Sequence, residues 1–146
     1  MGCSASVPEL PAWARELLEV SRVGRLGLLD DAGAPRVLPV TYAISGDALV
    51  SAVDDKPKRV AGDRIARVRW LRADPRAALT VDHYEDDWTK LAWVQAIGTV
   101  RIVDVANAAD AIEALAGRYP RYAERRPAGP LLALRPERLL WWRASV

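Results

Sequence analysis

The chain has 146 residues, of which 51% are hydrophobic and 27% are charged, and its net charge is +2. This length and composition are typical of one globular domain with one core, so we expect residues 1–146 to form a single domain. No apolar stretch approaches the roughly 20 residues that span a bilayer, and the chain does not open with a secretory signal pattern. We therefore expect a cytoplasmic protein without a membrane anchor.

Helical and strand patterns alternate along the chain. Three helices are expected where apolar residues recur at helical spacing, over 11–20, 63–73 and 107–119. Strands are expected between clusters of turn residues, over 25–31, 36–44, 48–53, 77–84, 90–105, 131–134 and 138–144. Six or seven strands with only three helices indicate an antiparallel α+β barrel rather than a doubly wound sheet.

Several residues have positional meaning within these elements. Pro39 cannot donate a ladder hydrogen bond, so it marks a sheet edge, a bulge or a place where a ligand meets the backbone. Gly98 is expected at a bend of the long strand 90–105. Residues 120–130 are rich in Pro and Arg and are expected to form a loop. Trp141 and Trp142 alternate in the last strand, so one of them faces outward, which suggests a subunit interface.

Histidine and cysteine are too scarce for several kinds of site. Cys3 is the only cysteine and His83 the only histidine. One cysteine excludes an internal disulfide and a cysteine-based metal cage, and a facial-triad metal site needs a second histidine. Metalloprotease, zinc deaminase and Cys–His nucleophile chemistry are excluded on the same ground. No metal site is therefore expected, and His83 is interpreted as a surface hairpin histidine rather than a ligand or general base.

Basic residues are concentrated between Lys56 and Arg72, where the net charge is +6 against −4 for the rest of the chain. Such a local field attracts a nucleic acid, a nucleotide or a polyanionic cofactor, although a solvated arginine-rich helix face gives the same pattern. Trp70 is the only aromatic residue in this window, so there is no stacking array for nucleic acid. Neither common nucleotide-binding motif is present. A phosphorylated cofactor is thus the leading hypothesis, and nucleic-acid binding is the weaker one.

The aromatic residues Trp88 and Trp93 follow the acidic turn that comes after His83. Tryptophan buries a large area wherever it lies, so both residues could simply pack in the core or at an interface. The functional interpretation is a wall against an aromatic cofactor.

A series of short segments along the chain has a recognisable order. They are Arg25-Leu26-Gly27, Asp31-Ala32-Gly33-Ala34-Pro35, Val37-Leu38-Pro39-Val40, Asp55-Lys56-Pro57-Lys58-Arg59, Leu71-Arg72-Ala73-Asp74-Pro75-Arg76, Val81-Asp82-His83-Tyr84, Gly98-Thr99-Val100 and the span from Pro136 to Trp142. Their order resembles the pyridoxamine 5′-phosphate oxidase-like split barrels, and within them the class that uses the deazaflavin coenzyme F420. The match is closest to an actinobacterial subgroup with an Asp-His-Tyr-x-Asp-Asp-Trp turn. Asp74 stands where relatives often carry Asn, and either residue suits that turn.

This resemblance implies a six-stranded antiparallel split β-barrel with a few flanking helices. It also implies a homodimer with a cofactor groove at the subunit interface. Lys56, together with Lys58 or Arg59, would hold the cofactor phosphate, and each such charge-assisted bond contributes about 1.5–3 kcal/mol. The basic helix residues Arg64, Arg67 and Arg69 would steer an anionic tail such as the polyglutamate of F420. The expected cofactor-binding residues are Pro39, Val40, Thr41, Ser51, Ala52, Val53, Lys56, Lys58, Arg59, Arg64 and Trp88.

The activity implied by the resemblance is an oxidoreductase in which F420 transfers a hydride to or from a small organic substrate. No catalytic residue is assigned, and Thr41 and Tyr42 are the nearest candidates for a proton donor. An FMN-dependent enzyme of the same fold is the first alternative, because Lys56 would hold a flavin phosphate equally well. A non-enzymatic cofactor-binding protein is the second alternative. The sequence does not indicate the substrate.

Overall fold

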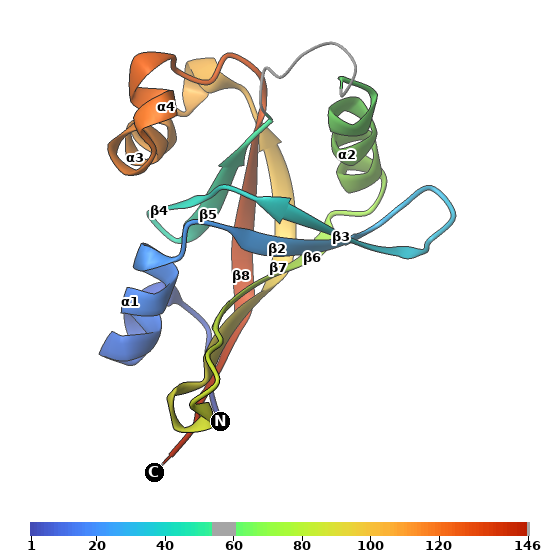
Figure 1. Ribbon diagram of the computed structural model, residues 1–146. Helices are drawn as coiled ribbons and strands as arrows, with labels where there is room; N and C mark the ends of the chain where they lie inside the picture. Colours follow the sequence, from blue (N-terminus) through green and yellow to red (C-terminus); the bar gives the residue numbers. More distant parts are fainter. Residues whose placement is uncertain (54–60, 146) are drawn as a thin grey trace.

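The computed structural model describes residues 1–53 and 61–145, and of residues 61–65 it describes only the backbone. Within these residues eight strands form one curled antiparallel sheet with four α-helices around it (Figure 1). The strands are β1 (Gly2–Ser4), β2 (Gly24–Leu29), β3 (Pro35–Val40), β4 (Ala43–Ser45), β5 (Ala48–Ala52), β6 (Arg76–His83), β7 (Ala92–Val103) and β8 (Leu131–Arg143). The α-helices are α1 (Ala12–Val20), α2 (Ala61–Ala73), α3 (Ala109–Arg118) and α4 (Pro120–Glu124). No helix among the described residues is both long and apolar enough to cross a membrane.

The strands are ordered β3-β2-β6-β7-β8-β5-β4 across the sheet, and β1 pairs with the end of β8 that β5 does not reach. Every pairing is antiparallel, as expected for a mainly β domain of the α+β class. Two hairpins turn at Gly33 and Gly46, whose φ angles of 74° and 59° lie in the left-handed region that glycine adopts without strain. Both glycines fall in turns that the sequence predicted.

The expected number of six strands is wrong, because three strand boundaries differ from the expectation. Residues 2–4 add a short edge strand, and the expected strand 36–44 divides into β3 and β4. The division follows from Tyr42, whose backbone N–H is bonded to the Tyr119 hydroxyl at 3.1 Å instead of a neighbouring strand. Residues 131–143 form one strand where two were expected, and the loop expected over 120–130 begins with α4, which has Pro120 in its first turn.

The continuity of β8 depends on how it accommodates Pro136. The ladder between β7 and β8 shifts its register between Ile97 and Gly98, and Gly98 lies opposite Pro136. A Cβ atom on Gly98 would lie 2.0 Å from the Arg135 carbonyl oxygen, so only glycine fits there. The expected bend at Gly98 is therefore confirmed as a bulge at which β8 passes its proline.

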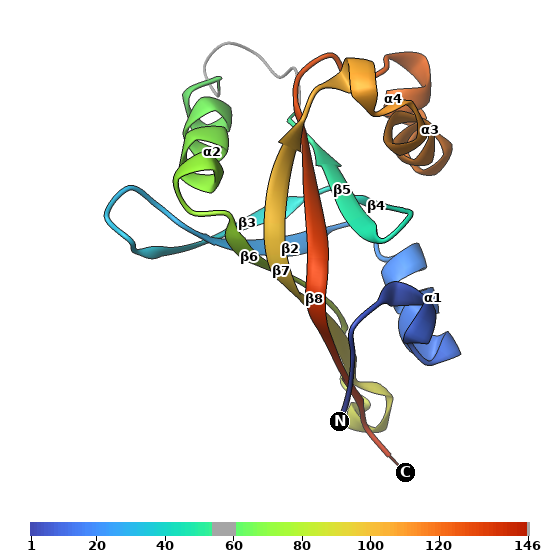
Figure 2. The same cartoon turned by 180° about the vertical axis from the view of Figure 1, so that it is seen from behind.

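Two clusters of apolar side chains form the core. The larger cluster fills the concave face of the sheet, where α1 packs on β6 and β7 and α2 packs on β2 and β7. The smaller cluster lies between α3 and the strands β4 and β5. In Figure 2, β7 and β8 run down the middle of the molecule, with α2 on one side and α1, α3 and α4 on the other.

One face of the sheet therefore carries side chains that belong to neither core cluster. We call it the open face, and it is formed by the residues of β2, β3, β6, β7 and β8 that alternate with the core residues. Its half-buried apolar members include Trp93, Ile97, Leu140 and Trp142.

Candidate functional site

The first wall of the expected site is the corner between β3 and β4, which contains Thr41 and Tyr42. The Thr41 hydroxyl lies 3.0 Å from the Tyr122 hydroxyl on α4. The Tyr119 hydroxyl accepts the Tyr42 N–H at 3.1 Å and lies 3.0 Å from the Tyr42 carbonyl oxygen and 2.9 Å from that of Arg22. These contacts join the corner to the end of α3 and to α4, so it is a rigid part of the fold.

Tyr42 serves this corner as a buried anchor. Its side chain is fully buried, and its hydroxyl donates to the Leu18 carbonyl at 2.5 Å. The guanidinium of Arg118 lies over the Tyr42 ring, 4.7 Å from its centre, and also donates to the Leu18 carbonyl at 3.0 Å. Burial raises the pKa of Tyr42 to about 12. A buried hydroxyl committed to a helix end does not suit a proton donor, so Thr41 is the remaining candidate of the two.

The raised pKa of Tyr42 predicts a loss of stability at alkaline pH. Below pH 10 the tyrosine is neutral in both states, and between pH 10 and about 12 only the unfolded chain ionises at this residue. Stability contributed by the neutral side chain is therefore lost as the pH rises through this window. Urea unfolding at pH 9, 10 and 11 should show a steeper loss for the wild type than for Tyr42→Phe. Parallel curves for the two proteins would contradict this assignment.

The second wall is the end of β5, where Ser51, Ala52 and Val53 were expected to line the cofactor. Ser51 is 5% exposed, and its hydroxyl has no hydrogen-bond partner among the described residues. The Val53 N–H is bonded to the Pro130 carbonyl at 3.2 Å, which fixes the end of the strand. A buried hydroxyl without a partner is costly, and a bound polar ligand is one way to satisfy it. This end of β5 therefore fits a cofactor with polar ring atoms.

The remaining residues of the two walls differ in orientation. Val40 and Ala52 are each 5% exposed and contribute side chains to the two core clusters, so only their backbone can face a ligand. Pro39 is exposed and pairs with Arg25 of β2 at the outer edge of the sheet. β3 is an edge strand of the described sheet, which confirms the edge interpretation of Pro39.

Most of the basic residues expected to bind phosphate lie outside the residues that the structure describes. Lys56, Lys58 and Arg59 lie outside the described residues, and only the backbone of Arg64 is described, in the first turns of α2. Arg69 pairs with Asp31 of the β2–β3 turn at 3.0 Å, which ties that hairpin to α2. The structure therefore gives Arg69 an intramolecular partner.

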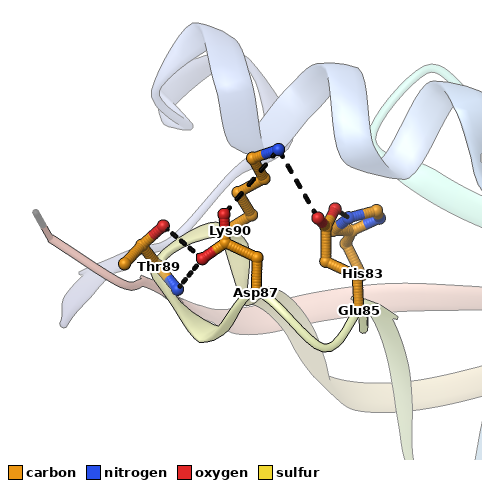
Figure 3. A network of polar contacts seen from close by, with 5 residues as sticks. All are labelled: His83, Glu85, Asp87, Thr89 and Lys90. Carbon is orange, nitrogen blue, oxygen red and sulfur yellow. Dashed lines mark hydrogen bonds and ion pairs between the residues drawn. The ribbon is translucent and has the colours of Figure 1, made fainter.

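A projecting segment between β6 and β7 carries Trp88. We call residues 84–91 the arm, and its turn η3 (Trp88–Lys90) is held by Asp87, which accepts hydrogen bonds from the Thr89 N–H at 3.1 Å and the Thr89 hydroxyl at 2.6 Å (Figure 3). These bonds lower the pKa of Asp87, with the side-chain bond the larger cause. Trp88 is 69% exposed, which excludes a core role for this residue.

Charged groups brace the base of the arm. His83 Nε2 lies 2.6 Å from Glu85, and the Lys90 ammonium lies 3.6 Å from Glu85 and 3.8 Å from Asp87 (Figure 3). The hydrogen bond to His83, followed by the charge of Lys90, lowers the pKa of Glu85. His83 thus has a carboxylate partner on the surface hairpin. No cluster of His, Cys, Asp and Glu suited to a metal ion occurs in the described residues.

A single chain does not bring Trp88 to the other expected site residues. The arm lies at one end of β7 and the end of β5 lies near the other (Figure 1). β5 meets β8 at Leu131, which pairs with Val103, while the arm joins β7 at Ala92. The 11 residue steps between Ala92 and Val103 correspond to roughly 37 Å along the strand.

The open face is a candidate interface that the sequence predicted only in part. In the ladder, Trp93 pairs with Trp142, and Ile97 pairs with Arg138 and Ala78. Two of the six tryptophans thus lie together on a face that none of the described helices covers (Figure 2). The outward tryptophan of the last strand was the one sequence signal for this face, since the rest depends on strand register.

These features match a known family. The sequence pattern described as pyridoxamine 5′-phosphate oxidase matches residues 10–143, so the chain belongs to this family. The family includes flavin-binding proteins and oxidoreductases. The match of this chain to the family confirms the resemblance that the order of the segments indicated. No curated protein matches the chain.

Solved structures of this fold bind several cofactors. A heme binding protein from Mycobacterium smegmatis is 25% identical, with a TM-score of 0.70, and the match covers 92% of this chain but 55% of that one. An FAD-binding protein from Mesorhizobium loti is 22% identical, with a TM-score of 0.66 and coverage of 99% and 100%. An F420 reductase is 22% identical, with a TM-score of 0.65 and coverage of 90% and 98%. The chain thus spans about half the length of the first of these neighbours.

Proposed function

We propose that this protein is an F420-dependent oxidoreductase that transfers a hydride to or from a small organic substrate. The observation that carries the proposal is the buried Ser51 hydroxyl, which has no partner among the described residues and lies at the end of β5, five residues before Lys56. The polar edge of the cofactor ring would bind the Ser51 hydroxyl, and the cofactor phosphate would bind the basic segment that begins at Lys56. The similar fold of an F420 reductase supports the choice of cofactor.

The chain's own residues would bind and orient the cofactor. Lys56, with Lys58 or Arg59, would pair with the phosphate, and Arg64 would add positive charge at the start of α2. Ser51 would offer its hydroxyl to the ring, and the backbone of 39–41 would form the facing wall. When bound, the deazaflavin supplies the hydride chemistry, and the protein excludes water and fixes the geometry. Thr41, held by Tyr122, is the nearest hydroxyl that could exchange a proton with a substrate.

Dimerisation through the open face would complete the site. The apolar group Trp93, Ile97, Leu140 and Trp142 is flanked by charges of both signs, Asp82 on one side and Arg25 and Arg138 on the other. A two-fold axis can therefore place the acidic margin of one copy against the basic margin of the other. An apolar centre with a charged rim is typical of such interfaces.

The same dimer would explain the position of Trp88. A two-fold axis perpendicular to β7 and β8 makes these strands antiparallel in the two copies. The arm of one copy then lies beside the β5 end of the other, although the two lie at opposite ends of one chain. Trp88 would thus cover the cofactor held by the second copy, and its 69% exposure in the single chain would be removed.

A ligand panel tests the proposed cofactor. We expect F420 to raise the melting temperature more than FMN, FAD or haem. A ligand at 100 times its Kd adds about 2.7 kcal/mol of stability, so binding of the correct cofactor should be measurable in this panel. Lys56→Ala should abolish the shift, while Arg15→Ala, which removes an exposed charge on α1, should keep it. A larger shift with FMN would favour the alternative flavin enzyme of this fold. No shift with any of the four would contradict the proposal.

A further inference from the structure

A cavity lies on the concave side of the sheet, between the arm, α1 and the end of β8. Its volume is about 650 Å³, which is within the range of small-molecule pockets. Arg143 lines it and shares its strand face with Leu139 and Trp141, the latter of which packs against the larger core cluster. The cavity therefore lies on the opposite side of the sheet from the open face, and the proposed dimer would leave it accessible.

The lining combines apolar side chains with basic and polar ones. The apolar residues are Trp13 and Leu17 of α1 with Leu91 and Ala92 of the arm and β7. The basic and polar residues are His83, Thr89, Lys90, Arg143 and Ser145, and no carboxylate is among the described residues that line the cavity. Such a surface suits a ligand with an apolar body and an anionic group.

Arg143 is the cation in this lining that has a free charge. Its guanidinium lies over the Trp13 ring, 5.0 Å from the ring centre, and none of the ion pairs among the described residues includes it. Lys90 is already paired with Glu85 and Asp87, and His83 with Glu85 (Figure 3). A cation–π contact leaves the N–H groups of the guanidinium available for a carboxylate.

We propose that this cavity binds a small planar carboxylic acid. The ligand's carboxylate accepts hydrogen bonds from the Arg143 guanidinium, and its planar body packs on Trp13, Leu17 and Leu91. Thr89 and Lys90 contribute polar groups to the same lining. The site needs neither the deazaflavin nor the second copy, so it stands independently of the proposed function.

Benzoate and benzamide test this site, because they share a shape and differ in charge. Titration of the full chain, followed by the indole signal of Trp13 in two-dimensional NMR, should show saturable binding of benzoate. Benzamide should bind at least about tenfold more weakly, because it lacks the charge that Arg143 recognises. Equal binding of the two compounds, or no binding of benzoate, would overturn the proposal.

Matched variants locate the binding site. Arg143→Gln should weaken benzoate binding by about tenfold or more, while Arg15→Gln, also an exposed arginine beside this region but outside the lining, should not. Ala144→Phe should block the cavity by volume and leave the melting temperature near that of the wild type. Benzoate binding that survives both Arg143→Gln and Ala144→Phe would place the ligand elsewhere and refute the site.

Discussion

Replacing Gly98 by alanine is expected to cost about 3 kcal/mol or more of stability. The added Cβ atom would lie 2.0 Å from the Arg135 carbonyl oxygen and 3.0 Å from the Pro136 Cα atom. Both are backbone atoms, so no side chain can rotate away, and β7 and β8 must separate at the centre of the sheet. Urea unfolding measures the loss, and a protein that fails to fold is consistent with it.

Gly117→Ala is the matched control for this prediction. No atom lies within 4 Å of the position that its Cβ would take, and the residue lies in α3. Alanine there should stabilise the protein by about 0.5–1 kcal/mol, because it has the higher helix propensity. Similar stability changes for the two variants would show that the bulge at Gly98 is wrongly described.

Tyr119→Phe is expected to cost about 2–3 kcal/mol and to weaken cofactor binding as well. The lost hydroxyl accepts the Tyr42 N–H and lies within hydrogen-bond distance of two carbonyl oxygens. Tyr119 and Tyr42 are both buried, so water cannot easily replace these bonds. Because Tyr42 follows Thr41, the β3–β4 corner should loosen and the proposed cofactor wall with it.

The exposed Tyr84 supplies the control for Tyr119. Its side chain is 66% exposed, so Tyr84→Phe should change the free energy of unfolding by no more than about 0.5 kcal/mol. Urea unfolding gives the stability of both variants, and F420 titration gives the affinity. A Tyr119→Phe protein as stable as Tyr84→Phe would contradict the role given to this hydroxyl.

Local signals in the sequence predicted the elements but not their ends. Apolar periodicity predicted the positions of α1, α2 and α3. Gly33 and Gly46 predicted the positions of the two hairpin turns. The corner at Thr41 and Tyr42 has no glycine, asparagine or proline after Pro39, and it is held by tyrosine hydroxyls from 77 or more residues away. A single long strand was therefore the natural expectation for residues 36–44.

The proposed site could be predicted from the sequence only where its residues are close together along the chain. Ser51, Val53 and the basic segment are close in sequence, so the family resemblance was enough to group them. That the Ser51 hydroxyl has no partner among the described residues depends on packing, and the open face depends on register across five strands. The contact of the Arg143 guanidinium with the Trp13 ring brings together residues 130 positions apart in the chain, and no local pattern indicates it.

The central claim is that two copies of this chain pair through the open face and so complete one deazaflavin groove per chain. Sedimentation velocity with F420, recorded at the absorbance of the cofactor, tests it directly for the wild type, Leu140→Glu and Val20→Glu. We predict that F420 sediments with a wild-type dimer at one per chain, and that Leu140→Glu is monomeric and carries none. Val20 is 59% exposed on α1, away from the open face, so Val20→Glu should behave like the wild type. A monomeric wild type that binds F420, or a dimer that binds none, would contradict the claim.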